Sequence, residues 1–315
     1  MKNIFVIAEV GSNWRTLVDC LNSITLAKNC GADAVKFQLF SHRELYGYDG
    51  EMPFSLPREW IPKLVEKAKS CGIEFMCTAF SLDGYMFLNQ YVKKHKVASS
   101  NMLHIPILQY LKTVGKPVIL STGGGWSLKD VSLALATLAD SPPVFLLHCV
   151  AAYPANRTKL DRIFVLQEKF PKCIIGYSDH STNYTDIPIY AKSLGAELIE
   201  KHVNFVNCKE TPDSPHSLST EQFQVMVRLL KEGGLDIEND AEEDDMKLRH
   251  LVRLMATEDI ASGSKLVYGH NYGIFRSKKD APEAMHAMQW DKVDGQVVSR
   301  NVAKGTPIFA ALLDV

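Results

Sequence analysis

The sequence contains no apolar run long enough to enter or cross a membrane. Its first residues include one short run, from Ile4 to Ala8, which Glu9 ends. A secretory signal needs about 7–15 apolar residues, and a membrane-spanning helix needs about 20. We therefore expect a cytoplasmic protein with no membrane partner.

The chain also lacks an excess of charge of either sign. Its 35 Lys and Arg residues are balanced by 36 Asp and Glu residues. The chain therefore lacks the excess positive charge that is typical of proteins that bind nucleic acid. The sequence has no Gly-x-x-x-x-Gly-Lys-Ser/Thr loop, so a nucleotide phosphate is disfavoured as a ligand. The partners we expect are small-molecule substrates.

Closely spaced cysteine pairs are missing as well. The seven cysteines are odd in number and form no Cys-x-x-Cys motif. Most lie in apolar or helical surroundings, which is typical of reduced, buried thiols in a cytosolic protein. A redox or zinc role for them is disfavoured.

The sequence does have a regular alternation of short apolar runs and longer amphipathic segments. The apolar runs predict strands at residues 4–8, 34–39, 73–77, 96–98, 117–120, 144–147, 173–176 and 197–203. Helical patterns lie between them, for example at residues 16–29, 57–70, 128–139, 163–170 and 183–193. Eight strand–helix repeats predict an α/β protein with a (β/α)8 TIM barrel.

The last quarter of the chain changes character. An acidic run, residues 236–245, follows the glycines at 233 and 234. Beyond it the sequence has short β-like pieces, at 254–257 and 296–299, and no strong helix. We expect a barrel domain at 1–235, a linker at 236–250 and a small β-rich domain at 251–315, which would be marginally stable alone.

Polar residues recur where each predicted barrel strand ends. This is where the chemistry of a (β/α)8 barrel lies. The residues are Glu9, Lys36, Gln38, Thr78, Ser81, Lys96, Ser99, Asn101, Ser121, Thr122, His148, Tyr153, Ser178, Asp179, His180, Glu200 and His202. Burying so many polar groups is costly unless they meet partners or a ligand, so together they predict a site.

Strand alternation refines this prediction. Side chains two residues apart share one face of a strand, so Lys36 and Gln38 should point together, as should Glu200 and His202. Lys201 should then point away from the barrel interior.

Two of these residues suit a metal. His180 and His202 end neighbouring predicted strands, so their imidazoles could meet over one divalent ion such as Mn²⁺. Lysines and serines at the same end of the barrel are the donors that hold a carboxylate and a phosphate.

The same segments resemble the sialic acid synthase family, which also makes legionaminic and pseudaminic acids. The similarity covers nearly the whole chain in order, and the ordered set is highly specific. The matching segments are Ile7-Ala-Glu-Val-Gly-Ser-Asn13, Asp33-Ala-Val-Lys-Phe-Gln38, Leu120-Ser-Thr-Gly123, His148-Cys149 with Tyr153-Pro154, Ile175-Gly-Tyr-Ser-Asp-His180, Leu198-Ile-Glu-Lys-His202, and Pro212-Asp213 with Ser217-Leu218.

The resemblance implies a synthase that condenses phosphoenolpyruvate with an N-acylated hexosamine, N-acetylmannosamine or a diacetamido-trideoxyhexose, and releases phosphate. It implies that His180 and His202 bind Mn²⁺, with Mg²⁺ and Co²⁺ as alternatives, and that the metal polarises the sugar aldehyde. By resemblance Lys36, Lys96, Ser99, Ser121 and Ser178 hold phosphoenolpyruvate, and Thr78 is a further substrate-binding residue. Gln38, Tyr153 and Asp213 would face the sugar, and Glu9, Glu200, His202 and Lys36 would be catalytic.

The tail, through Ala256-Thr-Glu-Asp-Ile-Ala-Ser-Gly263 and Val302-Ala-Lys-Gly305, is similar to the family's antifreeze-like (SAF) domain. The resemblance implies a domain-swapped homodimer in which Arg276 reads the N-acyl group. Four positions depart from the family pattern: Trp14, Asn101, Ala151 and Ser277. They put the identity of the sugar in question, but not the reaction class.

Three other interpretations remain open. A Schiff-base pyruvate aldolase would need a lysine that faces the barrel interior from mid-strand, and alternation turns Lys201 outward. A keto-deoxy-sugar phosphate synthase would also use phosphoenolpyruvate, but the SAF-like tail disfavours it. A catalytically inactive sugar-acid-binding protein could share the fold.

Overall fold

The computed structural model describes residues 4–138, 143–232, 252–276, 284–285 and 287–313. The chain divides into two compact units, Met1–Leu235 and Asp236–Val315. The predicted linker, 236–250, lies outside the described residues. No helix within the described ranges is long and apolar enough to cross a membrane.

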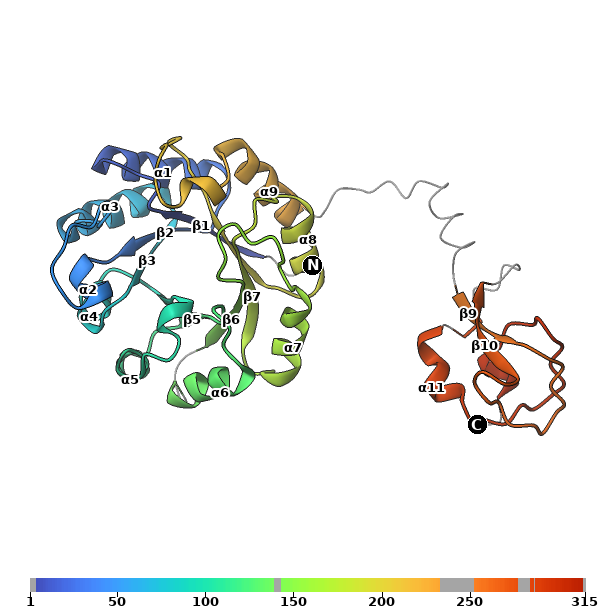
Figure 1. Cartoon of the computed structure of the whole chain (residues 1–315). Coiled ribbons are helices and arrows are strands. Elements are labelled where there is room, and N and C mark those ends of the chain that lie inside the picture. The colour runs from blue at the N-terminus through green and yellow to red at the C-terminus, as the bar shows by residue number, and fades with distance from the viewer. Residues whose placement is uncertain (1–3, 139–142, 233–251, 277–283, 286, 314–315) are drawn as a thin grey trace. The chain divides into compact units, whose positions relative to one another are not determined.

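The first unit is a barrel of parallel strands surrounded by helices (Figure 1). The strand order is β3-β2-β1-β8-β7-β6-β5-β4, the paired strands are parallel, and β3 also contacts β4. The strands are β1 (Phe5–Gly11), β2 (Ala34–Leu39), β3 (Glu74–Ala79), β4 (His95–Val97), β5 (Val118–Ser121), β6 (Val144–Cys149), β7 (Ile174–Asp179) and β8 (Leu198–His202). All eight predicted strands are therefore present, with ends shifted by up to three residues.

The outer helices are α1 (Leu17–Asn29), α2 (His42–Tyr46), α3 (Ile61–Cys71), α4 (Leu82–Leu88), α5 (Ile105–Val114), α6 (Leu128–Thr137), α7 (Asp161–Lys169), α8 (Asp186–Ser193) and α9 (Thr220–Glu232). Local sequence sets several of their starts. Thr16 and Ser127 form capping boxes with Asp19 and Asp130 at the starts of α1 and α6, which satisfies otherwise unpaired backbone N–H groups.

The strands bury apolar residues on both faces. Toward the helices, residues such as Val6, Val35 and Ile199 join the large core. Toward the barrel axis, a smaller cluster fills the interior with Ile7, Ala34, Met76, Ile119, Leu147 and Leu198. Because this layer is packed with side chains, no channel runs through the barrel. A ligand can therefore bind only at one end of the barrel.

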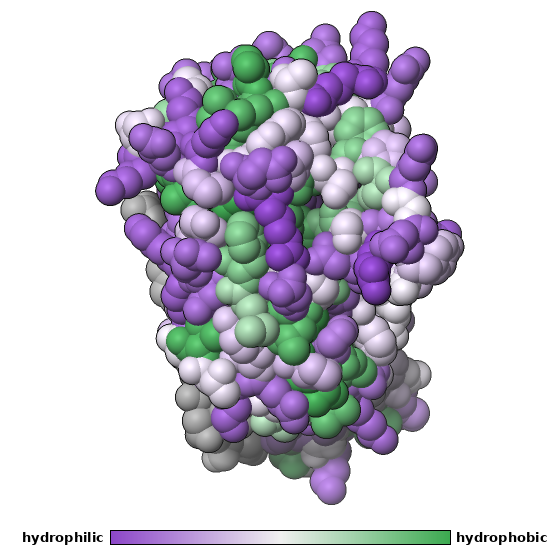
Figure 2. Space-filling view, turned by 90° about the vertical axis from the view of Figure 1, so that its left-hand side faces the viewer, coloured by the Kyte–Doolittle hydropathy of each residue, from purple (hydrophilic) through white to green (hydrophobic). Residues whose placement is uncertain are grey.

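The outer surface is mixed. Figure 2 shows the side of the molecule that carries α2, α3 and α4, where hydrophilic residues surround small, separate hydrophobic areas. Scattered apolar groups of this kind are normal for a protein surface.

The second unit has its own small hydrophobic core, which includes Leu254, Leu266, Tyr272, Val298 and Ile308. Its two-stranded antiparallel sheet pairs β9 (Val252–Ala256) with β10 (Tyr272–Arg276), and its one described α-helix, α11 (Trp290–Val293), is short. The predicted β-like piece at 254–257 corresponds to β9. The piece at 296–299 forms only isolated bridges, through Val297 and Val298.

Candidate active site

A polar layer lies directly above the apolar filling of the barrel, one alternation step further along each strand. In β8, for example, Leu198 belongs to the apolar filling and Glu200 to the polar layer. The layer consists of Glu9, Lys36, Thr78, Lys96, Ser121, Cys149, Ser178 and Glu200, all of them buried. Side chains two residues apart point to the same face of a strand, so these residues lie one level above the apolar layer.

The centre of this layer is an ion-pair network. Lys36 Nζ lies 2.8 Å from Glu9 Oε2 and 3.2 Å from Glu200 Oε2, and it donates to Thr78 Oγ1 at 3.3 Å. Burial alone would lower the pKa of Lys36, but Glu200 and Glu9 outweigh burial and raise it. Lys36 is therefore an ammonium, not the free amine that a Schiff base requires.

Glu200 also connects the network to a second lysine and to a serine. Lys96 Nζ lies 3.3 Å from Glu200 Oε1, and Ser178 Oγ donates to the same oxygen at 2.9 Å. Burial acts to raise the pKa of Glu200, but Lys36 and Lys96 outweigh it and the pKa falls below its usual range. Burial raises the pKa of Glu9, although Lys36 opposes this. Two neighbouring carboxyl groups thus have different proton affinities, as acid–base pairs in enzymes do.

A cavity of about 490 Å³ opens above the network. Twelve residues predicted for the site line it, namely Lys36, Gln38, Thr78, Lys96, Ser99, Ser121, Tyr153, Ser178, His180, Glu200, His202 and Asp213. Glu9 lies next to the lining, where it accepts a hydrogen bond of 2.8 Å from Gln38. The structure therefore brings together the barrel residues to which the family resemblance assigns a role.

The two predicted metal ligands lie side by side at the rim. The ring centroids of His180 and His202 are 5.6 Å apart. His180 Nδ1 lies 2.8 Å from the carbonyl oxygen of Val150, a contact that orients the ring. Its Nε2 lies 3.4 Å from Ser178 Oγ, another residue that lines the cavity. Burial lowers the pKa of His180 to about 4 and that of His202 to about 3. Neutral imidazoles of this kind can coordinate a metal.

Asp213 reaches the same rim from the segment after β8. Its Oδ2 accepts a hydrogen bond of 2.7 Å from the backbone N–H of Ser12. A Cβ on Gly11 would lie 2.1 Å from that oxygen, and Gly11 has a φ of +56°. Gly11 therefore both makes the turn at the end of β1 and leaves room for the carboxylate.

Sequence reasoning missed one of the three histidines that line this cavity, His216. It closes a 3-10 turn, Ser214–His216, and its side chain is buried beside those of His202 and Asp213. A histidine close after Asp213 in the matched Pro212-Asp213 segment was the signal available in the sequence.

Some residues that we singled out lie elsewhere. His148 faces the helices, where it stacks on Tyr177 and its Nε2 contacts the Thr158 carbonyl oxygen. Its strand neighbour Cys149 faces the cavity instead, because alternate side chains of a strand point to opposite faces. The prediction of His148 as a strand-end residue at the site was therefore wrong.

Of the three departures from the family pattern that the structure describes, only Ala151 lines the cavity. Trp14 is buried against Phe54 and Trp60, and the Asn101 side chain donates to the Phe80 carbonyl oxygen. Ser277 lies outside the described residues. Arg276 ends β10 in the second unit.

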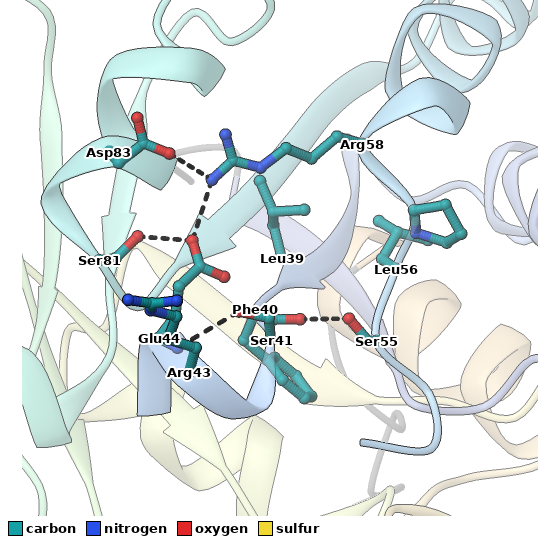
Figure 3. Close-up of a pocket in the computed structure, with 11 residues that line it drawn as sticks. Leu39, Phe40, Ser41, Arg43, Glu44, Ser55, Leu56, Arg58, Ser81 and Asp83 are labelled. Carbon is teal, nitrogen blue, oxygen red and sulfur yellow. Dashed lines mark hydrogen bonds and ion pairs between the residues drawn. The ribbon is translucent and has the colours of Figure 1, made fainter. Parts of the chain in front are cut away.

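A second cavity, of about 630 Å³, lies beside the ends of β2 and β3. Figure 3 shows the Arg58 guanidinium group between Asp83 and Glu44, at 2.6 and 3.0 Å. Ser81 Oγ donates to the same Glu44 carboxylate at 2.7 Å. Because these groups satisfy one another, this larger cavity offers less to a ligand than the smaller one at the barrel axis.

Comparison with known proteins settles the family. Residues 47–235 match the model of the NeuB family. The chain belongs to the NeuB family. Spore coat polysaccharide biosynthesis protein SpsE of Bacillus subtilis is 33% identical over 249 residues, which cover 71% of this chain and 66% of that protein.

Other members match this NeuB-family chain over more of its length. N,N'-diacetyllegionaminic acid synthase of Campylobacter jejuni is 29% identical over 96% of this chain and 97% of that protein. The crystal structure of N-acetylneuraminic acid synthetase from Leptospira borgpetersenii superposes with a TM-score of 0.69, at 30% identity, over 78% of this chain and 91% of that one. The (β/α)8 fold and the family recognised from the sequence are thus confirmed.

Proposed function

We propose that this protein is a nonulosonic (sialic-type) acid synthase, which condenses phosphoenolpyruvate with an N-acylated hexosamine and releases phosphate. The observation that carries the proposal is the polar layer at the barrel mouth, with Lys36, Lys96, Glu9 and Glu200 beneath a histidine-lined rim. Relatives named as synthases of legionaminic and N-acetylneuraminic acid support it.

Phosphoenolpyruvate fits the lysine side of the cavity. Lys36 and Lys96 supply two buried lysine side chains, each paired with Glu200, and Ser121 Oγ is buried without a hydrogen-bond partner among the described residues. The backbone N–H of Gly123 donates to Ser99 Oγ at 3.1 Å, and the serine O–H donates to Cys149 Sγ at 3.7 Å. A phosphate oxygen is a stronger acceptor than this sulfur. Ammonium groups and hydroxyl donors are the chemistry that holds a carboxylate and a phosphate.

The rim fits a divalent metal. His180 and His202 are neutral, and His202 Nδ1 is a buried nitrogen without a hydrogen-bond partner among the described residues. Imidazole nitrogens with nearby carboxylate oxygens suit Mn²⁺. When bound, the metal would polarise the sugar aldehyde.

The protein's own residues would position the reactants. Gln38 and Tyr153 line the cavity and can face the sugar, as can Asp213, which Ser12 holds in place. Glu9 and Glu200 are the carboxyl groups that contact Lys36, and they would transfer protons or position water. C3 of phosphoenolpyruvate forms the new bond to the aldehyde carbon, water adds at C2, and phosphate leaves with C–O cleavage.

We assign residues 251–315 to an SAF-type domain whose Arg276 reads the N-acyl group in the barrel of a second copy of the chain. The small core of this unit supports a domain that benefits from docking. The seven cysteines are all free, which supports a reducing, cytoplasmic setting.

The deciding experiment is mass spectrometry of the products formed from phosphoenolpyruvate and a panel of N-acyl hexosamines. A nonulosonic acid formed with stoichiometric phosphate release is expected with at least one sugar. The His202→Ala variant should give no product. If only phosphorylated aldoses were consumed, the protein would be a keto-deoxy-sugar phosphate synthase, and the proposal would fail.

A further inference from the structure

A tighter group of metal-binding atoms lies beside the predicted pair of histidines. His202, Asp213 and His216 each offer one ligand atom, and these atoms all lie within 4.8 Å of one another. The ring centroids of His202 and His216 are 4.8 Å apart, closer than the 5.6 Å between His180 and His202. His216 thus has a better position relative to His202 than the predicted partner has.

The nitrogens of this group lack other partners. His202 Nδ1 and His216 Nε2 are both buried and make no hydrogen bond to any described residue, and the two side chains are only 6% and 4% exposed. Asp213 approaches both, with Oδ1 at 3.4 Å from His216 Nε2 and Oδ2 at 3.9 Å from His202 Nδ1. Buried polar atoms without partners are rare and costly in native proteins, so their convergence indicates a binding site.

The backbone holds this group in place. Asp213 is fixed through Ser12, and the His216 N–H donates to the Asp213 carbonyl oxygen at 3.3 Å. Tyr153 contacts the ring of His216, with centroids 4.8 Å apart, and stacks on His180 at 4.2 Å. Side chains restrained in this way lose little entropy when they bind an ion.

We propose that His216 and Asp213 bind the same divalent ion as His202. The ion then has more protein ligands than His180 and His202 alone would supply. The inference rests on the proposed function, because it concerns the metal of that active site. Each additional imidazole strengthens binding of a transition metal relative to Mg²⁺. The ion in this protein is therefore held tightly even without substrate.

The test measures Mn²⁺ binding to the metal-free, full-length protein without substrate. The free ion is quantified by electron paramagnetic resonance, and the number of bound nitrogens by its pulsed form. We expect His216→Asn to weaken Mn²⁺ binding at least tenfold and to remove one coordinated nitrogen. Asp213→Asn should weaken binding without removing a nitrogen. His104→Asn, at an exposed histidine before α5, is the matched control and should change neither value.

The outcomes separate this inference from the proposed function. If His216→Asn binds Mn²⁺ as the wild type does while His202→Asn loses it, His216 is not a ligand, but the histidine-pair site stands. If the wild-type protein binds no divalent ion, both ideas about the metal fail, whereas synthesis of product would still be measurable. Thermal melting of each variant, with His216→Gln as a second substitution, distinguishes lost ligation from lost folding.

Discussion

Lys201 Nζ lies 2.6 Å from Asp179 Oδ2 at a point where neither side chain exposes any surface. The ammonium also donates to the carbonyl oxygens of Ser181 and Asn183, at 2.7 and 2.8 Å. Lys201 thus faces the helices, as strand alternation predicts, and holds the segment that carries His180. It is not placed to act as the Schiff-base lysine of an aldolase.

We expect Lys201→Met to destabilise the protein by about 3–5 kcal/mol, because Asp179 would remain as a buried charge without its partner. Urea unfolding measures this loss. Lys201→Met combined with Asp179→Asn should lose less than the single variant. Lys94→Met is the matched control, since its ion pair with Glu74 is partly exposed and should contribute about 1 kcal/mol or less. Equal losses from Lys201→Met and Lys94→Met would contradict the expectation.

Ser121→Ala should affect stability and catalysis differently. Ser121 Oγ is buried without a partner among the described residues, so its removal should leave the free energy of unfolding unchanged or raise it by up to about 1 kcal/mol. If the hydroxyl binds phosphoenolpyruvate, kcat/KM for that substrate should fall about tenfold, or 1.4 kcal/mol.

The control for this experiment is Ser23→Ala. Ser23 is buried in α1 and donates to the Asp19 carbonyl oxygen at 2.8 Å. Its loss should cost about 1 kcal/mol of stability with unchanged kinetics. A Ser121→Ala enzyme that uses phosphoenolpyruvate normally would remove Ser121 from the substrate site.

Gly11→Ala should displace Asp213. The new Cβ would occupy the position of the carboxylate and break its bond to Ser12, which costs about 1.5–3 kcal/mol beyond the left-handed backbone strain of about 1–2 kcal/mol. Gly115→Ala, with a φ of +74° and no neighbouring atom within 4 Å, should show the backbone strain alone and keep full activity. Comparable sugar turnover in both variants would show that Asp213 does not need this position.

Mixing two inactive variants tests the exchanged tail. In a swapped dimer, His202→Ala and Arg276→Ala chains should form one site with an intact barrel and an intact arginine, so part of the activity should return. Subunit exchange is followed with distinguishable tags on the two chains. If exchange occurs and activity does not return, Arg276 serves its own barrel or has no part in catalysis.

The barrel could be predicted well because its pattern is local. Each strand is a short apolar run, and the period of two sends Glu200 and His202 inward and Lys201 outward without knowledge of the neighbouring strands. The two-stranded sheet of the second unit was harder to predict. Only β9 was recognised, since β10, Tyr272–Arg276, is a short run interrupted by Gly273 and is defined by its pairing with β9 rather than by a local period.

Strand direction and alternation depend on consecutive residues, so most of the side chains that reach the barrel mouth can be predicted from the sequence. How these side chains pair there depends on the folded barrel. Glu200 joins two lysines from β2 and β4, and these contacts depend on the curvature of the closed sheet. His216 lies against His202 because the backbone N–H of Ser12 holds Asp213 in place. Ser12 and Asp213 are 201 residues apart in the chain. Contacts of that range follow from packing around the whole barrel, which no local period encodes.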